Sequence, residues 1–176
     1  MTRLKNYIKE ELNWRRIAEI IKKDCKPYLK EIGNLSLYRG MFDEKRPFVK
    51  KISRTDRKPK DSSLVSHKIM DNIFKKKYGW KARSEGVFVT GDRSITHAYG
   101  ITYIYFPIGK YKYLWSPNIH DLGTEIVSDR IKLITDNYTN KNLKLAAKSN
   151  NEIIFKVKEY YVVDENYYRK LYKELI

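Results

Sequence analysis

The chain has 176 residues, of which 41% are hydrophobic and 33% are charged, and it carries a formal net charge of +16. This length and composition suit one domain with a single core and exclude a disordered or fibrous protein. No stretch reaches the roughly 18 apolar residues of a membrane-spanning helix, and the charged N-terminus has no signal-peptide core, so we expect a soluble, cytoplasmic domain spanning residues 1–176.

The positive charge narrows the set of partners. A field of this sign attracts polyanions and phosphate-bearing small molecules, which makes nucleic acid a candidate partner. A lysine-rich surface that is only solvated explains the charge equally well. Cys25 is the only cysteine and histidines are not clustered, so the sequence predicts neither a disulfide nor a metal site. We expect Cys25 to lie on a surface helix without a catalytic role.

Residues 1–30 are predicted to be an N-terminal helical segment. Within it, apolar residues recur at helical spacing over residues 4–26, between lysines and glutamates, which predicts one amphipathic helix, or two with a break near Asn13, ended by Pro27. A short strand is predicted at residues 35–38, with Arg39 and Gly40 at its end. An arginine there can reach into a cleft, while a glycine leaves room for a ligand against the main chain.

Residues 42–61 are predicted to form a long basic loop. Arg54 and Arg57 are candidates for gripping a diphosphate or a nucleic-acid backbone, because guanidinium groups match phosphate oxygens bidentately. A mobile charged connector is the alternative interpretation.

A helix should follow, with its N-cap at Asp61 or Ser62 and its end at Tyr78 and Gly79. His67 falls at a mostly polar position, where a structural role is more common than a catalytic one. The predicted apolar face consists of Leu64, Val65, Ile69, Ile73 and Phe74.

The stretch from Gly86 to Gly100 predicts a pocket wall. A short buried strand, residues 87–89, leads to Thr90 and Gly91, which offer a hydroxyl group and open backbone to a ligand. One or two helical turns should then end at Gly100.

Alternating residues predict two strands at 101–106 and 110–115, as a hairpin or as separate members of a sheet. Lys110 and Lys112 share one face of the second, and aromatic residues the other, which suits base stacking over a basic rim. An ordinary half-buried strand is the favoured interpretation. Helices are predicted at 118–136 and 143–147, strands at 152–157 and 160–163, and a closing helix capped by Asp164.

An arginine and a glycine closing a strand, a threonine strand leading into a helix, and Glu152 opening a late strand resemble, in this order, the three-motif active site of small phage- or toxin-type ADP-ribosyltransferases. The resemblance covers residues 35–163 and implies an α+β fold with split, mixed small sheets around an NAD cleft and flanking helices. The chain departs from the family's pattern at Val89 to Asp92, which lacks a Ser-Thr-Ser triplet, and at Asn150, two residues before the glutamate.

The resemblance implies that ADP-ribose is transferred from NAD to a macromolecular acceptor and that nicotinamide is released. Glu152 would stabilise positive charge on the ribose and act on the nucleophile, Arg39 would anchor the dinucleotide, and Thr90 would orient the glutamate. Tyr38 and Tyr99 are candidates for stacking on nicotinamide. Asp121 and Glu125 remain rival acids. The implied NAD-binding set is Tyr38, Arg39, Gly40, Thr90 and Tyr99.

Nucleic acid is the favoured acceptor and an acidic protein the next, with Arg54, Arg57, Lys110 and Lys112 as the contact candidates. We expect a monomer without metal, acting in the host cytoplasm if it is phage-encoded. One alternative in the same fold is an NAD-dependent RNA 2′-phosphotransferase, for which Arg54, Arg57 and His67 would surround the phosphate. The alternative of a different class is a non-enzymatic, basic nucleic-acid-binding protein.

Overall fold

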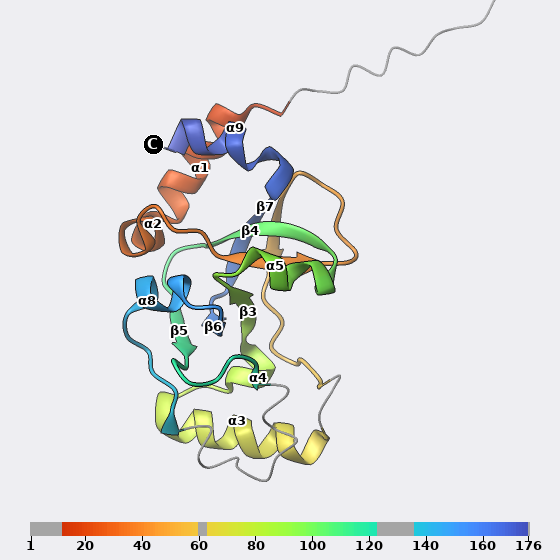
Figure 1. The fold of residues 1–176 in the computed structure, drawn as a ribbon, viewed down its shortest axis with the longest axis vertical. Helices are drawn as coiled ribbons and strands as arrows, with labels where there is room; N and C mark the ends of the chain where they lie inside the picture. The colour runs from red at the N-terminus through yellow and green to blue at the C-terminus, as the bar shows by residue number, and fades with distance from the viewer. Residues whose placement is uncertain (1–11, 60–62, 123–135, 176) are drawn as a thin grey trace, which may run out of the picture.

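A computed structural model describes residues 12–59, 63–122 and 136–175 (Figure 1). Over these residues the chain has the expected α+β class, with one seven-stranded antiparallel sheet in the order β2-β7-β4-β1-β3-β6-β5. The strands are β1 (Tyr38–Met41), β2 (Phe48–Ile52), β3 (Val87–Thr90), β4 (Ile101–Pro107), β5 (Lys112–Trp115), β6 (Glu152–Lys156) and β7 (Glu159–Asp164). The helices are α1 (Trp14–Asp24), α2 (Lys26–Ile32), α3 (Leu64–Tyr78), α4 (Ala82–Glu85), α5 (Arg93–Thr96), the 3-10 turn η1 (His97–Tyr99), α8 (Leu143–Lys148) and α9 (Glu165–Leu175).

The sheet narrows to a single residue pair at its centre. Strand β1 pairs with β4 along its whole length but with β3 only at Tyr38 and Thr90. The sheet therefore consists of two halves, β2-β7-β4-β1 and β3-β6-β5, which meet at this pair. In Figure 1, β4 runs across the view while β3 runs along the long axis of the molecule. The site residues discussed below lie at this junction.

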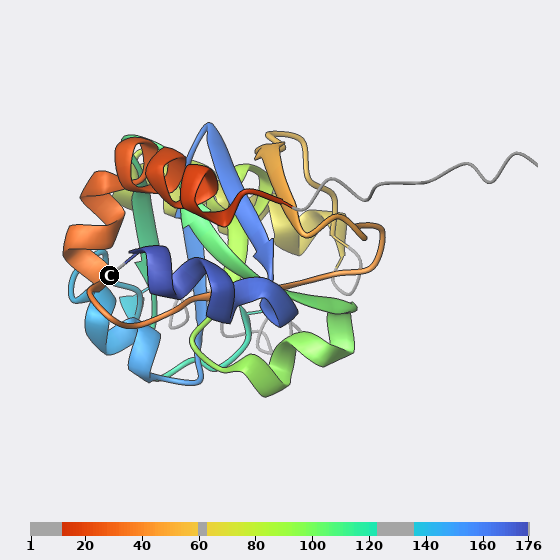
Figure 2. The ribbon, with the colours of Figure 1, turned by 90° about the horizontal axis from the view of Figure 1, so that it is seen from above.

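Two hydrophobic clusters hold the halves in place. Alternate residues of β3 face opposite ways, so Val87 and Val89 join the main core beneath α1, α2 and α8, while Phe88 packs against a second core at α3 and α4. Helices α1 and α9 lie side by side (Figure 2), where the rings of Trp14 and Tyr167 stack at 5.5 Å. The junction is thus covered by different helices on its two faces.

Several predicted elements need correction. The predicted basic loop contains strand β2, which pairs with β7. Strand β7 lies far along the chain, so the sequence of the loop itself does not reveal this pairing. Arg39 lies inside β1 and not at a strand end. Of the two arrangements predicted for β4 and β5, separate members of one sheet is the one found, since β4 pairs with β1 and β7 and β5 pairs with β6.

Two residues expected at polar surfaces are buried. Cys25 is fully buried between α1 and α2, and burial raises the pKa of its thiol to about 12, which leaves no reactive thiolate at neutral pH. His67 is also buried, because α3 turns a face containing His67, Met70, Asp71 and Phe74 toward the sheet. Leu64, Val65 and Ile69 belong to the predicted apolar face of this helix, but they are exposed.

Other predictions are confirmed. Helix α3 ends where expected, with Gly79 in the left-handed region at φ 80°, although its N-cap is Ser63. The strand, helical turns and terminal glycine of residues 86–100 are as predicted. The predicted helix at 118–136 falls largely outside the described residues, as does Glu125. Over the described ranges, no helix is long and apolar enough to cross a membrane.

Candidate active site

Three residues from the predicted motifs form one row across neighbouring strands. Tyr38 of β1 lies opposite Thr90 of β3, which lies opposite Glu152 of β6. Residues directly opposite one another in antiparallel strands project to the same face. The row therefore brings these three residues onto neighbouring strands at the junction of the two half-sheets, with Tyr38 near Arg93 and Glu165 and with Glu152 near Arg83 and Asp121.

Arg39 lies where the pairing between β1 and β3 ends, and its side chain bridges the two strands. Continued pairing would set Gly40 opposite Phe88, but the ladder stops after Tyr38 and Thr90. Instead, the Arg39 side chain reaches across, and its Nη1 donates to the carbonyl oxygen of Phe88 at 2.7 Å. The arginine thus satisfies a backbone acceptor that the strand no longer pairs.

Two further arginines converge on the ring of Phe88, which shares a face with Thr90. The guanidinium carbon of Arg57, from the segment after β2, lies 4.2 Å from the ring centroid, and that of Arg83, from α4, lies 5.8 Å away. We call Arg39, Arg57 and Arg83 the Phe88 arginine cluster. Three segments far apart in sequence supply its charges.

Arg57 lies close to the other cations of this cluster. Burial and the neighbouring cations Arg39, Arg83 and Arg54 together lower its pKa to about 10, while Glu152 opposes the shift. Nη1 of Arg57 and Nε of Arg39 are buried and have no hydrogen-bond partner among the described residues. Buried donors of this kind cost free energy until a ligand or water accepts from them.

Glu152 is the acid of the site, and its environment disfavours the charged form. Its Oε1 atom is buried and without a hydrogen-bond partner in the described part of the chain. Burial and then the negative charge of Asp121 raise its pKa to about 8, against the opposing effects of Arg83, Arg57 and the backbone N–H of Leu122. The carboxyl group is therefore mostly protonated at pH 7.

A buried aspartate on α3 fixes the arginines in position. Asp71 Oδ1 accepts from the backbone nitrogens of Arg83 at 2.8 Å and Ser84 at 3.2 Å, and its Oδ2 accepts from the Ser84 hydroxyl. The carbonyl oxygen of Ser84 accepts from the backbone nitrogen of Arg57 at 3.2 Å. Helix α3 thereby holds α4 and the Arg57 segment together.

His67 also takes part in the hydrogen-bond network through which α3 holds α4. Its Nε2 lies 3.0 Å from the Ser84 hydroxyl, whose single proton goes to Asp71. The imidazole therefore donates from Nε2, and burial lowers its pKa, which favours the neutral form. His67 positions its neighbours in the arginine cluster and does not serve as a charged group.

Neighbouring parts of the protein lie too close to Gly40 and Gly91 for either position to carry a side chain. A Cβ atom on Gly40 would lie 2.4 Å from the carbonyl oxygen of Thr96 and 2.5 Å from Cβ of Tyr99. A Cβ atom on Gly91 would lie 1.9 Å from the carbonyl oxygen of Ala147. The expectation that these positions leave backbone open to a ligand is therefore wrong, because η1 and the end of α8 occupy the space.

The remaining tyrosine and threonine candidates lie close to the row. Thr90 is buried, and its hydroxyl group accepts from the backbone nitrogen of Asp92 at 3.1 Å, which shapes the turn into α5. Tyr99 is 52% exposed beside Gly40, so its ring is accessible. Tyr38 is partly buried, and burial together with Glu165 raises its pKa.

Other predicted contact residues lie apart from the row. Arg54 is exposed and forms an ion pair with Asp56 at 3.5 Å. Lys110 precedes β5 and is exposed, and Lys112 lies opposite Lys156, at the other end of β6 from Glu152. Strand β5 is half-buried in the ordinary way, with its aromatic residues in the core.

Sequence analysis missed two members of the site, Phe88 and Arg83. Phe88 was expected in a fully buried strand, yet it is partly exposed. Its position two residues before Thr90 was the available signal, because the strand period places both side chains on one face. Nothing in the sequence around Arg83 distinguishes it from a surface arginine.

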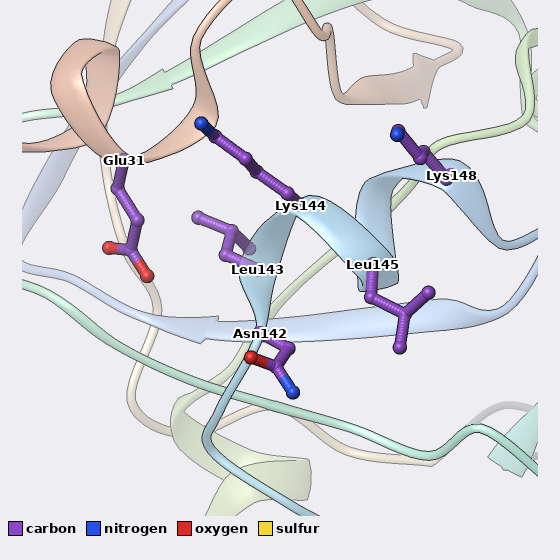
Figure 3. A pocket seen from close by; sticks show the side chains of 6 residues that line it. All are labelled: Glu31, Asn142, Leu143, Lys144, Leu145 and Lys148. Atoms are coloured by element: carbon purple, nitrogen blue, oxygen red, sulfur yellow. The ribbon is translucent and has the colours of Figure 1, made fainter.

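Two cavities lie elsewhere. One, of about 490 Å³, lies between α2 and α8 (Figure 3), where Lys144 extends toward the helix that carries Glu31. The other, of about 200 Å³, has a mainly apolar lining from α2, β4 and α9. Neither is lined by Arg39, Thr90 or Glu152.

Comparisons with known proteins provide no family for this chain. No family model matches it, and neither the curated proteins nor the solved structures contain a match. Within the described residues, no group of three or more histidine, cysteine, aspartate or glutamate side chains is arranged to hold a metal ion.

Proposed function

We propose that this protein transfers ADP-ribose from NAD to a nucleic-acid acceptor and releases nicotinamide. The observation that carries the proposal is the row Tyr38, Thr90, Glu152, with Arg39 at its edge. The three motifs that resemble those of ADP-ribosyltransferases thus occupy adjacent strands. This adjacency supports a single site around the reacting ribose.

The chemistry breaks the bond between C1′ of the ribose and the nicotinamide nitrogen. Nicotinamide leaves as a neutral molecule with the bonding electron pair, and positive charge develops on the ribose. An acceptor oxygen or nitrogen then bonds to C1′ and gives up its proton. Ionised Glu152 suits both needs, because a carboxylate stabilises the developing cation and accepts a proton.

The protonation state of Glu152 sets the expected pH profile. Its pKa of about 8 means that the carboxylate fraction grows as pH rises from 6 to 9. Because the ionised form is the one that stabilises positive charge and accepts a proton, nicotinamide release should increase over this interval. A profile that falls between pH 6 and 9 would contradict the role of the carboxylate.

The other side chains of the row suit parts of NAD. Arg39 retains a buried, unpartnered Nε among the described residues, a donor for a ribose or phosphate oxygen. Tyr99 and Tyr38 provide aromatic surface for nicotinamide, which is flat and cationic before cleavage. The net charge of +16 favours a polyanionic acceptor.

Incubation with NAD labelled in its adenylate part, together with separate pools of DNA, RNA and protein, tests the proposal. Label should enter a nucleic-acid pool and nicotinamide should appear. Glu152→Gln should slow both by at least about 100-fold, since it removes a group acting only in the transition state. Glu19→Gln, an exposed glutamate on α1, is the matched control and should retain activity. Full activity of Glu152→Gln would refute the assignment.

The Phe88 arginine cluster favours one second candidate, an NAD-dependent RNA 2′-phosphotransferase. Such an enzyme needs several arginines around a phosphate, and Arg57 and Arg83 lie beside Arg39, with His67 in their support. An RNA with an internal 2′-phosphate distinguishes the two: loss of that phosphate to NAD favours this candidate. A non-enzymatic binder would bind nucleic acid in a salt-dependent manner, indifferent to NAD and to Glu152→Gln.

A further inference from the structure

We propose that His120 removes the proton of the acceptor in the ADP-ribosyl transfer. The inference rests on the transferase function proposed above and assigns a residue to its second step. As an acceptor oxygen or nitrogen bonds to C1′, nicotinamide leaves with the electron pair of the broken bond. The proton of the acceptor passes to Nε2 of His120, and the imidazolium then releases it to water.

His120 lies beside Thr90 and Glu152, where β3 ends and β6 begins. Its carbonyl oxygen accepts from the backbone nitrogen of Glu152 at 2.9 Å, and its ring contacts the side chain of Asn151, the residue before Glu152. Asp92, two residues after Thr90, is also near, because hydrogen bonds within α5 and then the charge of His120 lower the pKa of Asp92. The imidazole therefore lies next to the ends of both strands that carry the proposed reacting groups.

Asn151 determines which nitrogen of the ring carries the proton. Nδ2 of Asn151 donates to the carbonyl oxygen of Ser116 at 2.8 Å, so this end of the amide is the nitrogen. The other end, Oδ1, therefore accepts from Nδ1 of His120 at 3.3 Å. In the neutral ring the proton is then on Nδ1, and Nε2 has the lone pair that accepts a proton.

The turn that carries His120 is fixed by a buried serine. Ser116 is fully buried, and its hydroxyl oxygen accepts from the backbone nitrogens of Asn118 and Ile119, each at 3.1 Å. Ile119 is itself buried in the second core. His120 is the next residue and is exposed, so a held backbone presents an accessible ring. A base for a macromolecular acceptor needs both features, because the acceptor approaches from solvent.

A separate base leaves Glu152 with one task. A carboxylate stabilises the developing ribose cation while it is charged, and it would lose that charge by taking up the proton of the acceptor. Burial and then Asp121 raise the pKa of Glu152 to about 8, so its ionised fraction is already small at pH 7. Histidine is the most common general base of enzymes at neutral pH, and His120 is the histidine beside this pair.

The test compares His120→Ala with the wild type, with Glu152→Gln and with His97→Ala, which changes the other exposed histidine. Each is incubated with NAD labelled in its adenylate part and with the acceptor pool that the wild type labels. His120→Ala should slow labelling by about 100-fold, the lower range for loss of a general base. Its affinity for NAD, measured by calorimetry, should stay unchanged. His97→Ala should label the acceptor at the wild-type rate.

Free imidazole separates proton transfer from a structural role. Because His120 is exposed, the space left in His120→Ala is open to solvent, and added imidazole should restore labelling. The same addition should not restore Glu152→Gln, whose missing group is buried and is not an imidazole. The apo Tm of His120→Ala should equal that of the wild type.

Each outcome decides between the two proposals. Wild-type labelling by His120→Ala would overturn the role of His120 and leave the transferase function standing. A loss of labelling that imidazole does not restore, or one accompanied by a lower Tm, would also overturn it, because His120 would then serve the fold. A wild type that releases no nicotinamide refutes the transferase function itself, and the role of His120 with it.

Discussion

Two glutamates with buried carboxylate oxygens behave in opposite ways in this protein. Glu44 is 3% exposed, and its carboxylate accepts from Arg46 Nε at 2.8 Å, from Arg46 Nη2 at 3.0 Å and from Lys51 Nζ at 2.6 Å. These hydrogen bonds hold the pKa of Glu44 well below its usual range, despite burial. Glu152 is also near arginines, yet its pKa is raised to about 8.

The difference lies in where the cations direct their donors. Arg46 and Lys51 bind the carboxylate of Glu44 directly. Arg57 and Arg83 stack on Phe88, and Arg39 donates to a backbone carbonyl oxygen, so burial dominates at Glu152. A carboxylate whose oxygens are saturated with hydrogen bonds stabilises the fold, whereas Oε1 of Glu152 has no hydrogen-bond partner among the described residues and can accept from a ligand.

The two groups should link stability to pH in opposite directions. The folded-state pKa of Glu44 is depressed, so its contribution is present above the unfolded pKa of about 4.5 and is lost as pH falls through the folded value. The folded-state pKa of Glu152 is raised, so its favourable contribution is present below about pH 4.5 and is lost as pH rises toward 8. The comparison can therefore be tested by mutation and by pH.

The largest expected effect is that of Glu44→Gln. Loss of hydrogen bonds from Arg46 and Lys51 to a charged acceptor should lower the free energy of unfolding by about 2 kcal/mol at pH 7, measured by urea denaturation. The difference from the wild type should shrink as pH falls and Glu44 becomes protonated. A neutral effect at pH 7 would show that the pair adds nothing to stability.

Glu152→Gln should change the free energy of unfolding by less than Glu44→Gln does, and in the opposite direction. At pH 9 the wild type must hold a charged, buried carboxylate, so the variant should be more stable by about 1 kcal/mol. At pH 4 both side chains are neutral and the two Tm values should converge. Thermal melts at both values of pH measure this, and a variant that is less stable than the wild type at pH 9 would contradict the raised pKa.

The substitution Asp121→Asn tests how much a neighbouring negative charge contributes to the raised pKa of Glu152. Removing the nearby negative charge should lower the pKa of Glu152 but leave it above its usual range, because burial is the larger cause and remains. A carboxyl-carbon NMR titration of Glu152 measures the shift directly. An unchanged titration would mean that Asp121 exerts no charge effect on the site.

Arg83→Gln should shift the same titration in the other direction. Removing a cation whose effect favours the charged form should raise the pKa of Glu152 further. Lys112→Gln, at the other end of β6, is the matched control and should leave the titration unchanged. A lowered pKa in Arg83→Gln would remove Arg83 from the electrostatics of the site.

Local patterns predicted much of the fold. Alternation located β4 and β5, short apolar runs located β3, β6 and β7, and the cap residues Gly79 and Asp164 lie where the sequence indicated. Strand β2 was missed because its five residues lie within a charged stretch that contains prolines. Gly40 was predicted to leave space for a ligand, but Thr96 and Tyr99 occupy the space that its missing side chain leaves. The sequence shows that a small residue is present and does not show whether a ligand or the protein itself lies against it.

The candidate site was predicted in part. Arg39, Thr90 and Glu152 were singled out because the stretches that carry them resemble, in this order, the three motifs of ADP-ribosyltransferases. The sequence did not indicate that Phe88 and Arg83 join Arg57, since these residues meet only through the α3 support. The adjacency of strands β1, β3 and β6 is likewise a result of pairing between segments far apart in the chain.

By itself, the sequence determined most of the elements, the net charge and the residue types available for chemistry, because these follow from short-range periodicity and composition. Only the tertiary structure decided that Glu44 is neutralised by two cations while Oε1 of Glu152 has no hydrogen-bond partner among the described residues. The reason is that the pKa of Glu152 depends on burial and on the charges of Asp121, Arg83 and Arg57, which lie far from it in the sequence. These groups surround Glu152 only once the chain has folded.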